Sequence, residues 1–377
     1  MKGMAVSKVV CIADRRLTGL VEEELRRMGL SDFYAEHGKQ VSLKTHRGLL
    51  GQRTRLMEAP ADITRFYVPR GREAEAMVRL AAATDLFLPG RGSLFSEPVM
   101  LWQPGGHAFD PDRLDLTPPA WAHNVPLKPS PHDMIWCVVQ RGRGNELAQT
   151  LLEMGLCVPT ISYGEGMGLR DRLGLLRITI PRDKEILLSV VLAADSDFVM
   201  DVMLRKARLR EPGRGYLCRS RVSALLTNTR MYQDPRRHVA SMEQIISTLD
   251  LLRGSTDWRR LPYAGGGAPS AISPHARRLV RFCLICEEGD SGRPISAVLN
   301  AGAGGATQTR LLRQSTTSEE GETATSSHAR ERCDLVVPRA LVRRLENALD
   351  ESGFFAEPSR GMAEVASVID AVSYATK

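Results

Sequence analysis

The stretch Glu211-Pro212-Gly213-Arg214-Gly215 has two similar copies elsewhere in the chain, and the prediction of the fold begins from these three copies. Leu88-Pro89-Gly90-Arg91-Gly92 is the first copy, and Glu357-Pro358-Ser359-Arg360-Gly361 is the third. Glycines allow a positive φ that turns backbone N–H groups toward an anion, and arginine adds a forked donor suited to phosphate. One such copy alone is more typical of a tight turn with a solvated arginine, so the repetition carries the argument.

The three copies share a fixed spacing. In each, an apolar strand-like run ends 20 positions before the turn proline: Pro69 and Pro89, Leu192 and Pro212, Pro338 and Pro358. A helix between these points carries an apolar residue nine positions before the proline in every copy, at Leu80, Met203 and Leu349. The constant offsets predict an internal threefold repeat.

Each repeat predicts the order strand, helix, strand, long loop, strand, helix, turn, strand. The runs Lys8–Asp14, Met134–Val139 and Leu279–Cys286 are the first strands of the three copies. This order is that of a βαββαβ, ferredoxin-like unit. The predicted fold class is therefore α+β, with three tandem ferredoxin-like units whose bare sheet faces pack together as an intramolecular pseudo-trimer.

The composition sets the predicted boundaries and the general class. The units are expected at 5–103, 134–228 and 279–377, joined by a Pro-rich linker over 104–133 and a linker with a helix over 229–278. With 43% hydrophobic and 25% charged residues among 377, the chain is typical of soluble globular proteins. The net charge of +7 admits an anionic partner without identifying one.

Targeting and metal signals are weak. No run of eighteen apolar residues and no signal peptide is visible, so we expect no membrane span and a cytoplasmic protein. Of seven cysteines, only Cys283 and Cys286 form a C-x-x-C, and no second pair accompanies them. Reduced thiols in cores are expected, rather than a metal site. No combination of side chains at catalytic spacing stands out, so we expect a protein that is not an enzyme.

The middle repeat resembles a known family. Arg141–Asn145, Met154–Gly166, Leu173–Pro181 and Glu211–Gly215 are together similar to the PII nitrogen regulatory proteins and their PII-like relatives. The similarity is closest over 134–226, and copies one and three match mainly in order and spacing.

The resemblance implies a signalling protein that binds an adenine nucleotide (ATP, ADP or AMP) as effector, with no tightly bound cofactor. It implies nucleotide clefts between units and long T-loops, at about 37–60, 164–185 and 312–331, that regulate a target protein in nitrogen or carbon metabolism. The implied ligand-binding residues are Gly213, Arg214 and Gly215, their counterparts Gly90, Arg91, Gly92, Arg360 and Gly361, and the T-loop base residues Thr160, Gly164 and Gly166.

Some family features are missing, and two other functions stay open. The family's usual phosphate-loop lysine is here an arginine and its T-loop modification tyrosine has no match, so neither 2-oxoglutarate sensing nor uridylylation is implied. The Ser/Thr/Glu-rich stretch Gln314–Ser327 is expected to be disordered without a partner. We expect the protein to be a monomer. We do not expect nucleic acid to be its main partner. The alternatives are a scaffold that has lost its ligand, and a nucleic-acid-binding protein that uses the basic loop 39–55.

Overall fold

The computed structural model describes residues 3–30, 32–48, 51–104, 113–125, 127–129, 131–167, 181–227, 232–233, 249–250, 252–254, 278–319, 322–356 and 361–373. No helix among them is both long enough and apolar enough to span a membrane.

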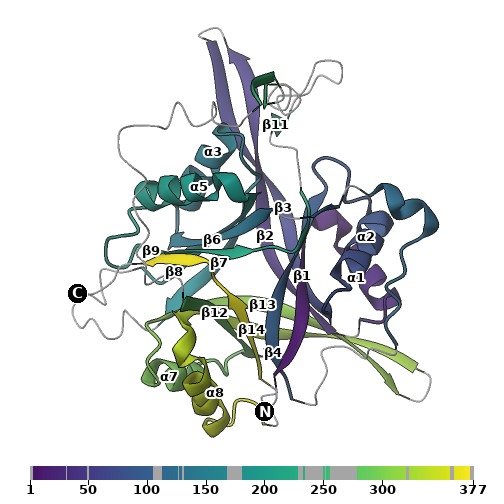
Figure 1. Ribbon diagram of the computed structural model, residues 1–377, viewed down its shortest axis with the longest axis vertical. Helices are drawn as coiled ribbons and strands as arrows, with labels where there is room; N and C mark the ends of the chain where they lie inside the picture. The colour runs from purple at the N-terminus through teal and green to yellow at the C-terminus, as the bar shows by residue number, and fades with distance from the viewer. Residues whose placement is uncertain are drawn as a thin grey trace.

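The elements follow one another in three comparable series (Figure 1). The first comprises β1 (Met4–Asp14), η1 (Arg15–Leu17), α1 (Thr18–Arg27), β2 (Asp32–Gly48), β3 (Gly51–Pro69), α2 (Glu73–Thr84) and β4 (Gly92–Trp102). After η3 (Ala120–Asn124) and β5 (Lys128–Pro129), the second comprises β6 (His132–Gln140), α3 (Gly144–Glu153), β7 (Thr160–Met167), β8 (Asp183–Leu192), α5 (Ala193–Lys206), β9 (Gly215–Arg221), β10 (Ala224–Leu226) and β11 (Tyr232–Gln233). The third comprises β12 (Leu279–Glu287), α7 (Gly292–Asn300), β13 (Ala306–Glu319), β14 (Glu322–Pro338), η8 (Arg339–Leu341), α8 (Val342–Glu351), β15 (Met362–Ser367) and β16 (Asp370–Ser373).

The first strand of each series pairs with two later strands of the same series. β1 lies antiparallel between β3 and β4, β6 between β8 and β9, and β12 between β14 and β15. The three predicted first strands are therefore strands in the structure. Each of them carries apolar side chains on both faces of the sheet, and both faces are buried.

The prediction of three tandem ferredoxin-like units in a pseudo-trimer is wrong. The strands form one continuous sheet, because β4 pairs with β15, β7 with β13, and β2 with both β7 and β13. Among the described strands, nine close into an antiparallel β-barrel, and the other strands extend the sheet. Exposed strand edges leave N–H and C=O groups unpaired, and closure across the series satisfies them.

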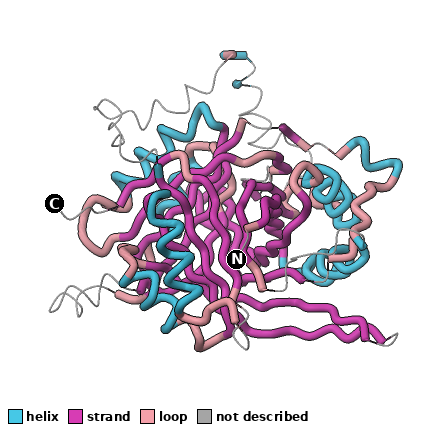
Figure 2. The backbone as a smooth tube through the Cα atoms, turned by 60° about the horizontal axis from the view of Figure 1, so that its bottom comes forward, coloured by secondary structure: helices cyan, strands magenta, loops and turns pink. Residues whose placement is uncertain are grey.

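The helices cover the outside of these strands (Figure 2). The pair α1 and α2, the pair α3 and α5, and the pair α7 and α8 each pack over a separate apolar cluster on the outer face. A fourth cluster lies between the strands themselves and combines side chains of all three series, among them Val10, Trp136 and Val336. This inner cluster is the part of the core that joins the series together.

Beside the inner apolar cluster lies a fully buried group of charges, defined here as the charged cluster. Its members are Lys8, Glu36, Arg65, Glu97, Arg281, Arg332, Asp334 and Glu364, each no more than 3% exposed. Lys8 Nζ lies 2.9 Å from Glu97 Oε1 and 2.5 Å from Glu364 Oε1, and Arg281 also pairs with Glu97. Trp136 has the guanidinium groups of Arg281 and Arg332 each 5.2 Å from its ring centroid.

Two of the three predicted long loops are instead long hairpins. Residues 37–60 belong mostly to β2 and β3, which pair as far as Gly48 and Gly51, and residues 312–331 belong mostly to β13 and β14. We call these the β2–β3 arm and the β13–β14 arm; both project from the body in Figure 1. Within Gln314–Ser327, expected to be disordered, the described residues 314–319 instead pair with 322–327 in an antiparallel ladder. Most of the third loop, 164–185, lies outside the described residues.

The predicted linkers are only partly described. Within 104–133, Leu116 is fully buried and Asp115 N donates to Met28 O at 3.1 Å, so this segment packs against the first series. The helix expected within the linker 229–278 falls mostly outside the described residues. The unit boundaries given above stay a prediction.

Candidate functional site

The turn at Glu211–Gly215 connects α5 to β9. After α5, Arg208 takes a left-handed φ of 54°, and Glu211 N then donates to Arg208 O at 3.0 Å. Arg214 N donates to Glu211 O at 3.4 Å, and Gly213 has a φ of 72°. A proline followed by a positive-φ glycine is the pattern of a type II turn, so the sequence determines this turn locally.

Gly215 brings the turn against β6. It has a φ of 130°, and a Cβ built on it would lie 1.8 Å from Val138 O. Gly215 pairs with Val139 at the first position of β9. A side chain here would push the turn away from the sheet, so the glycine is required for close approach.

The Arg214 guanidinium is already held by its surroundings. Its Nε donates to Glu211 Oε2 at 3.1 Å, and its Nη1 donates to Gln140 Oε1 at 3.2 Å. The side chain is 35% exposed, so the group is fixed at the surface with donors still available. Arg214 is therefore oriented before any ligand arrives.

Lys184, at the start of β8, is the residue that sequence reasoning missed. Its Nζ donates to Gly213 O at 3.4 Å, and the same oxygen accepts from Gln140 Nε2 at 3.3 Å. Lys184 is only 7% exposed, and no carboxylate pairs with it in the described part of the chain. Its burial lowers the pKa of Lys184 from the usual 10.5.

Two glycines of β7 lie beside this lysine. Gly164 pairs directly with Lys184, and a Cβ on Gly166 would lie 2.9 Å from Lys184 Cε. The absence of a side chain at Gly166 thus leaves room for the lysine stem. Gly166 also pairs with Thr307 at the start of β13, so this neighbourhood lies where the second and third series join.

The structure gathers five of the predicted ligand-binding residues around Lys184 and separates one. Thr160 is buried in β7 and pairs with Leu188 and Gln40. It is four strand positions from Gly164, or about 13 Å along the strand. The gathered residues are Gly164, Gly166, Gly213, Arg214 and Gly215.

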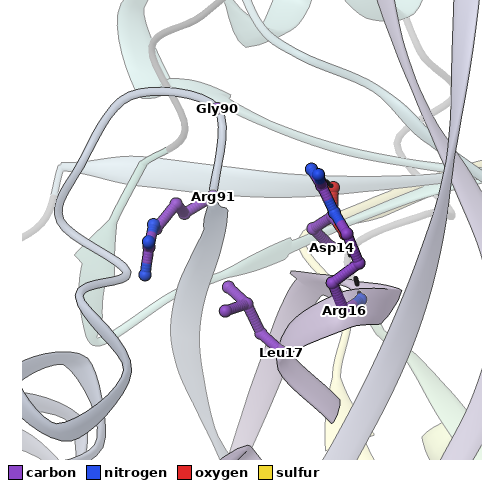
Figure 3. A pocket seen from close by; sticks show the side chains of 5 residues that line it. All are labelled: Asp14, Arg16, Leu17, Gly90 and Arg91. Atoms are coloured by element: carbon purple, nitrogen blue, oxygen red, sulfur yellow. Dashed lines mark hydrogen bonds and ion pairs between the residues drawn. The ribbon is translucent and has the colours of Figure 1, made fainter.

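The first turn borders a cavity of about 300 Å³ lined by Asp14, Arg16, Leu17, Gly90 and Arg91 (Figure 3). Gly90 has a φ of 86°, and Arg91 N donates to Leu88 O at 3.2 Å, as in the second turn. Gly92 is buried, and a Cβ on it would lie 2.2 Å from Ile12 O. The predicted residues Gly90, Arg91 and Gly92 are therefore brought together.

The charged side chains of this cavity already have partners within the protein. In Figure 3 the Arg91 side chain points away from Asp14; its Nη1 donates to Thr84 O at 3.1 Å. Arg16 donates to Asp14 through Nε and Nη2, and these hydrogen bonds lower the pKa of the Asp14 carboxyl. The carboxylate offsets the positive charge of Arg16, so this cavity is the weaker of the two candidate anion sites.

The third turn is described only at its end. Pro358, Ser359 and Arg360 lie outside the described residues, whereas Gly361 is buried and its N donates to Phe354 O at 2.9 Å. A Cβ on Gly361 would lie 2.4 Å from the same oxygen. Gly361 therefore has the close-packing role seen for Gly92 and Gly215, and the assignment of Arg360 stays a prediction.

The described residues offer no cluster of side chains that could hold a metal ion. All seven cysteines are buried and free. Burial raises the pKa of Cys11 and of Cys157 to about 12, and that of Cys286 in the C-x-x-C also to about 12. Thiols with such pKa values are protonated at neutral pH and are poor nucleophiles.

Comparison with known proteins assigns no family. No family model matches the chain, and no curated protein matches its sequence. Among solved structures, an aspartate kinase from Synechocystis is similar with a TM-score of 0.19 and 8% identity; the alignment covers 95% of this chain and 43% of the kinase. The chain thus spans less than half of that enzyme, and a similarity this low supports no functional argument. The resemblance to the PII proteins stays a prediction.

Proposed function

We propose that this protein is a regulatory binding protein, not an enzyme, that holds a phosphorylated effector between Lys184 and the turn Gly213–Gly215. An adenine nucleotide is the first candidate effector. The proposal places the protein in the cytoplasm, where its free buried thiols would stay reduced.

The observation that carries the proposal is the buried ammonium group of Lys184. A buried charge is costly unless it is paired, and among the described residues the lysine makes one long hydrogen bond, to a backbone carbonyl. Arg214, whose Nη1 lies 3.2 Å from Gln140 Oε1, adds a second cation, on the turn that Lys184 contacts. A phosphate group that contacts both cations would compensate the cost and would favour the charged form of the lysine.

The position of this site suggests how binding is transmitted. Gly166 lies against the Lys184 stem and pairs with Thr307, and β13 continues from there into the β13–β14 arm. We propose that an occupied site shifts the population of arm conformations and thereby the affinity for a target protein.

Titration calorimetry with ATP, ADP, AMP and inorganic phosphate tests the binding step. We expect Lys184→Met to lower the binding affinity for the ligand by about 10- to 100-fold, since hydrogen bonds to charged groups contribute about 1.5–3 kcal/mol. Arg214→Gln should act in the same direction. In the wild type, affinity should fall as pH rises toward 10.5, because the lysine then loses its proton before binding.

The matched control is Arg205→Gln, which removes an exposed charge that forms an ion pair with Asp201 on α5. It should bind like the wild type. Lys184→Met removes a buried unpaired charge, so its thermal midpoint should not fall. Absence of heat with every ligand, or equal affinity for Lys184→Met and Arg205→Gln, would rule out the proposed site.

A further inference from the structure

The β2–β3 arm concentrates positive charge on one of its two faces. Residues directly opposite in an antiparallel ladder share a face, and the register pairs Lys44 with Arg55 and His46 with Arg53. The two pairs are separated by one pair, Thr45 with Thr54, which belongs to the other face. Four basic residues thus lie on the same face of the ribbon.

This arrangement opposes the stability of the arm. Like charges directly opposite in a sheet repel each other, and here two such pairs follow one another. Arg55 is exposed and Lys44 half-buried, and neither forms an ion pair within the part of the chain that the structure describes. The nearest acidic residue of the ladder is Glu58, which pairs with Lys39 at 3.0 Å and also accepts from Asn145 at 2.7 Å.

The basic face lies on a segment that leaves the body. Val41 and Leu43 are buried in the cluster under α3, and beyond them the two strands pair with each other as far as Gly48 and Gly51 (Figure 1). Five residues of strand extend about 16 Å. The short strand β11 also pairs with β2 at Leu43 and Lys44. Beyond Lys44, the described part of the arm is a narrow two-stranded ribbon with a basic face.

We infer that the β2–β3 arm binds duplex DNA through this face. The major groove of B-form DNA is wide enough for a two-stranded ribbon, and its phosphates supply the negative charge that the paired cations lack. The inference does not depend on the effector site, because Lys184 and Arg214 lie on other strands.

Salt dependence of binding to a 20-base-pair duplex tests the inference. Three permanent cations, Lys44, Arg53 and Arg55, predict a slope of log K against log salt of about −3, or about a 40-fold loss of affinity between 50 and 200 mM salt. Lys44→Gln/Arg55→Gln should make the slope shallower by about 2. Because this variant relieves a like-charge pair, its thermal midpoint should be unchanged or higher.

Arg343→Gln/Arg344→Gln is the matched control, since it removes two exposed charges from α8. It should keep the wild-type slope. Failure of the wild type to bind DNA at 50 mM salt, or an equal slope for both double variants, would overturn the inference. The inference would also be overturned if the β2–β3 arm bound a second copy of the chain, at the acidic tip of that copy's β13–β14 arm, where Glu319 lies opposite Glu322. Sedimentation at low salt would then show a dimer that Glu319→Gln/Glu322→Gln abolishes.

Discussion

At the scale of single residues, the glycines of the repeated turn have two different roles. Gly90 and Gly213 take a positive φ within the turn, which the pattern Pro-Gly already indicates. Gly92, Gly215 and Gly361 instead allow the backbone to approach a neighbouring carbonyl. At Gly92 and Gly215 this second role depends on which strand lies opposite, and a single sequence does not contain that information.

Substitution of Gly215 separates close packing from backbone strain. Gly215→Ala should lower the free energy of unfolding by at least about 2 kcal/mol, because it adds a clash with Val138 O to the strain of a positive φ. Gly142→Ala is the control: its φ is 87°, yet nothing lies within 4 Å of the added Cβ, so it should cost only about 1 kcal/mol. Urea denaturation measures both, and similar losses in the two variants would show that no clash occurs.

The sequence identified the candidate site through Arg214 and its glycines but not through Lys184. Arg214 belongs to a repeated motif, whereas Lys184 stands alone beside Asp183 and Glu185, as a lysine on a solvated strand end would. Its burial depends on Gly166 and on the carbonyl of Gly213, which are distant in sequence. The pairing of β7 with β8 brings Gly166 to the lysine, and the pairing of β6 with both β8 and β9 brings the turn at Gly213.

At the scale of elements, the arms show why two predicted loops are strands. The stretches near 37–60 and 312–331 are polar, which is typical of loops, yet they contain β-branched residues and pair in register. A two-stranded hairpin alone is marginal in water, so its base must be anchored. Here β2 and β13 pair with each other at Asp32–Ala35 and Leu312–Ser315.

An ion pair at this anchor should couple the two arms. Arg313 donates to Asp32 through Nε at 2.8 Å and Nη2 at 2.7 Å, and both side chains are mostly buried. A double-mutant cycle with Asp32→Asn and Arg313→Gln should give a coupling energy of about 1–3 kcal/mol in urea unfolding. Additive effects of the two changes would show that the pair contributes nothing.

At the scale of the whole molecule, the barrel replaces the expected separate units, and its interior is not purely apolar. The charged cluster joins β1, β4, β12 and β15, and two of its guanidinium groups each lie 5.2 Å from the ring centroid of Trp136 in β6. Burial of so many charges costs free energy unless each is paired. The cluster therefore makes the strands of different series depend on one another.

Acid should reveal this dependence. Burial alone would raise the pKa of Glu364, but Lys8, Arg332 and Arg281 outweigh it and lower the pKa to about 2 from the usual 4.5. The carboxylate therefore stabilises the fold above pH 4.5, and this contribution is lost as pH falls from 4.5 toward 2. Glu364→Gln should lower the free energy of unfolding at pH 7 by about 3–5 kcal/mol. It should also flatten the acid limb, the part of the stability curve in which the free energy of unfolding falls as pH falls below 4.5.

Glu23→Gln, on the exposed surface of α1, is the control and should leave both quantities close to those of the wild type. Stability is measured by urea unfolding between pH 7 and pH 2.5. An acid limb as steep in Glu364→Gln as in the wild type would contradict the assignment of this pH dependence to Glu364.

By itself, the sequence determined the local structure: the strands at its apolar runs, the helices at their periodic faces and the turns at Pro-Gly. These follow from short-range sterics and from burial of adjacent residues. The tertiary structure alone decided that strand edges of different series pair, that polar stretches extend as arms, and that Lys184 is buried at the turn. Backbone hydrogen bonds between strands are nearly independent of side-chain identity, so strand partners are selected by the closure of the whole sheet.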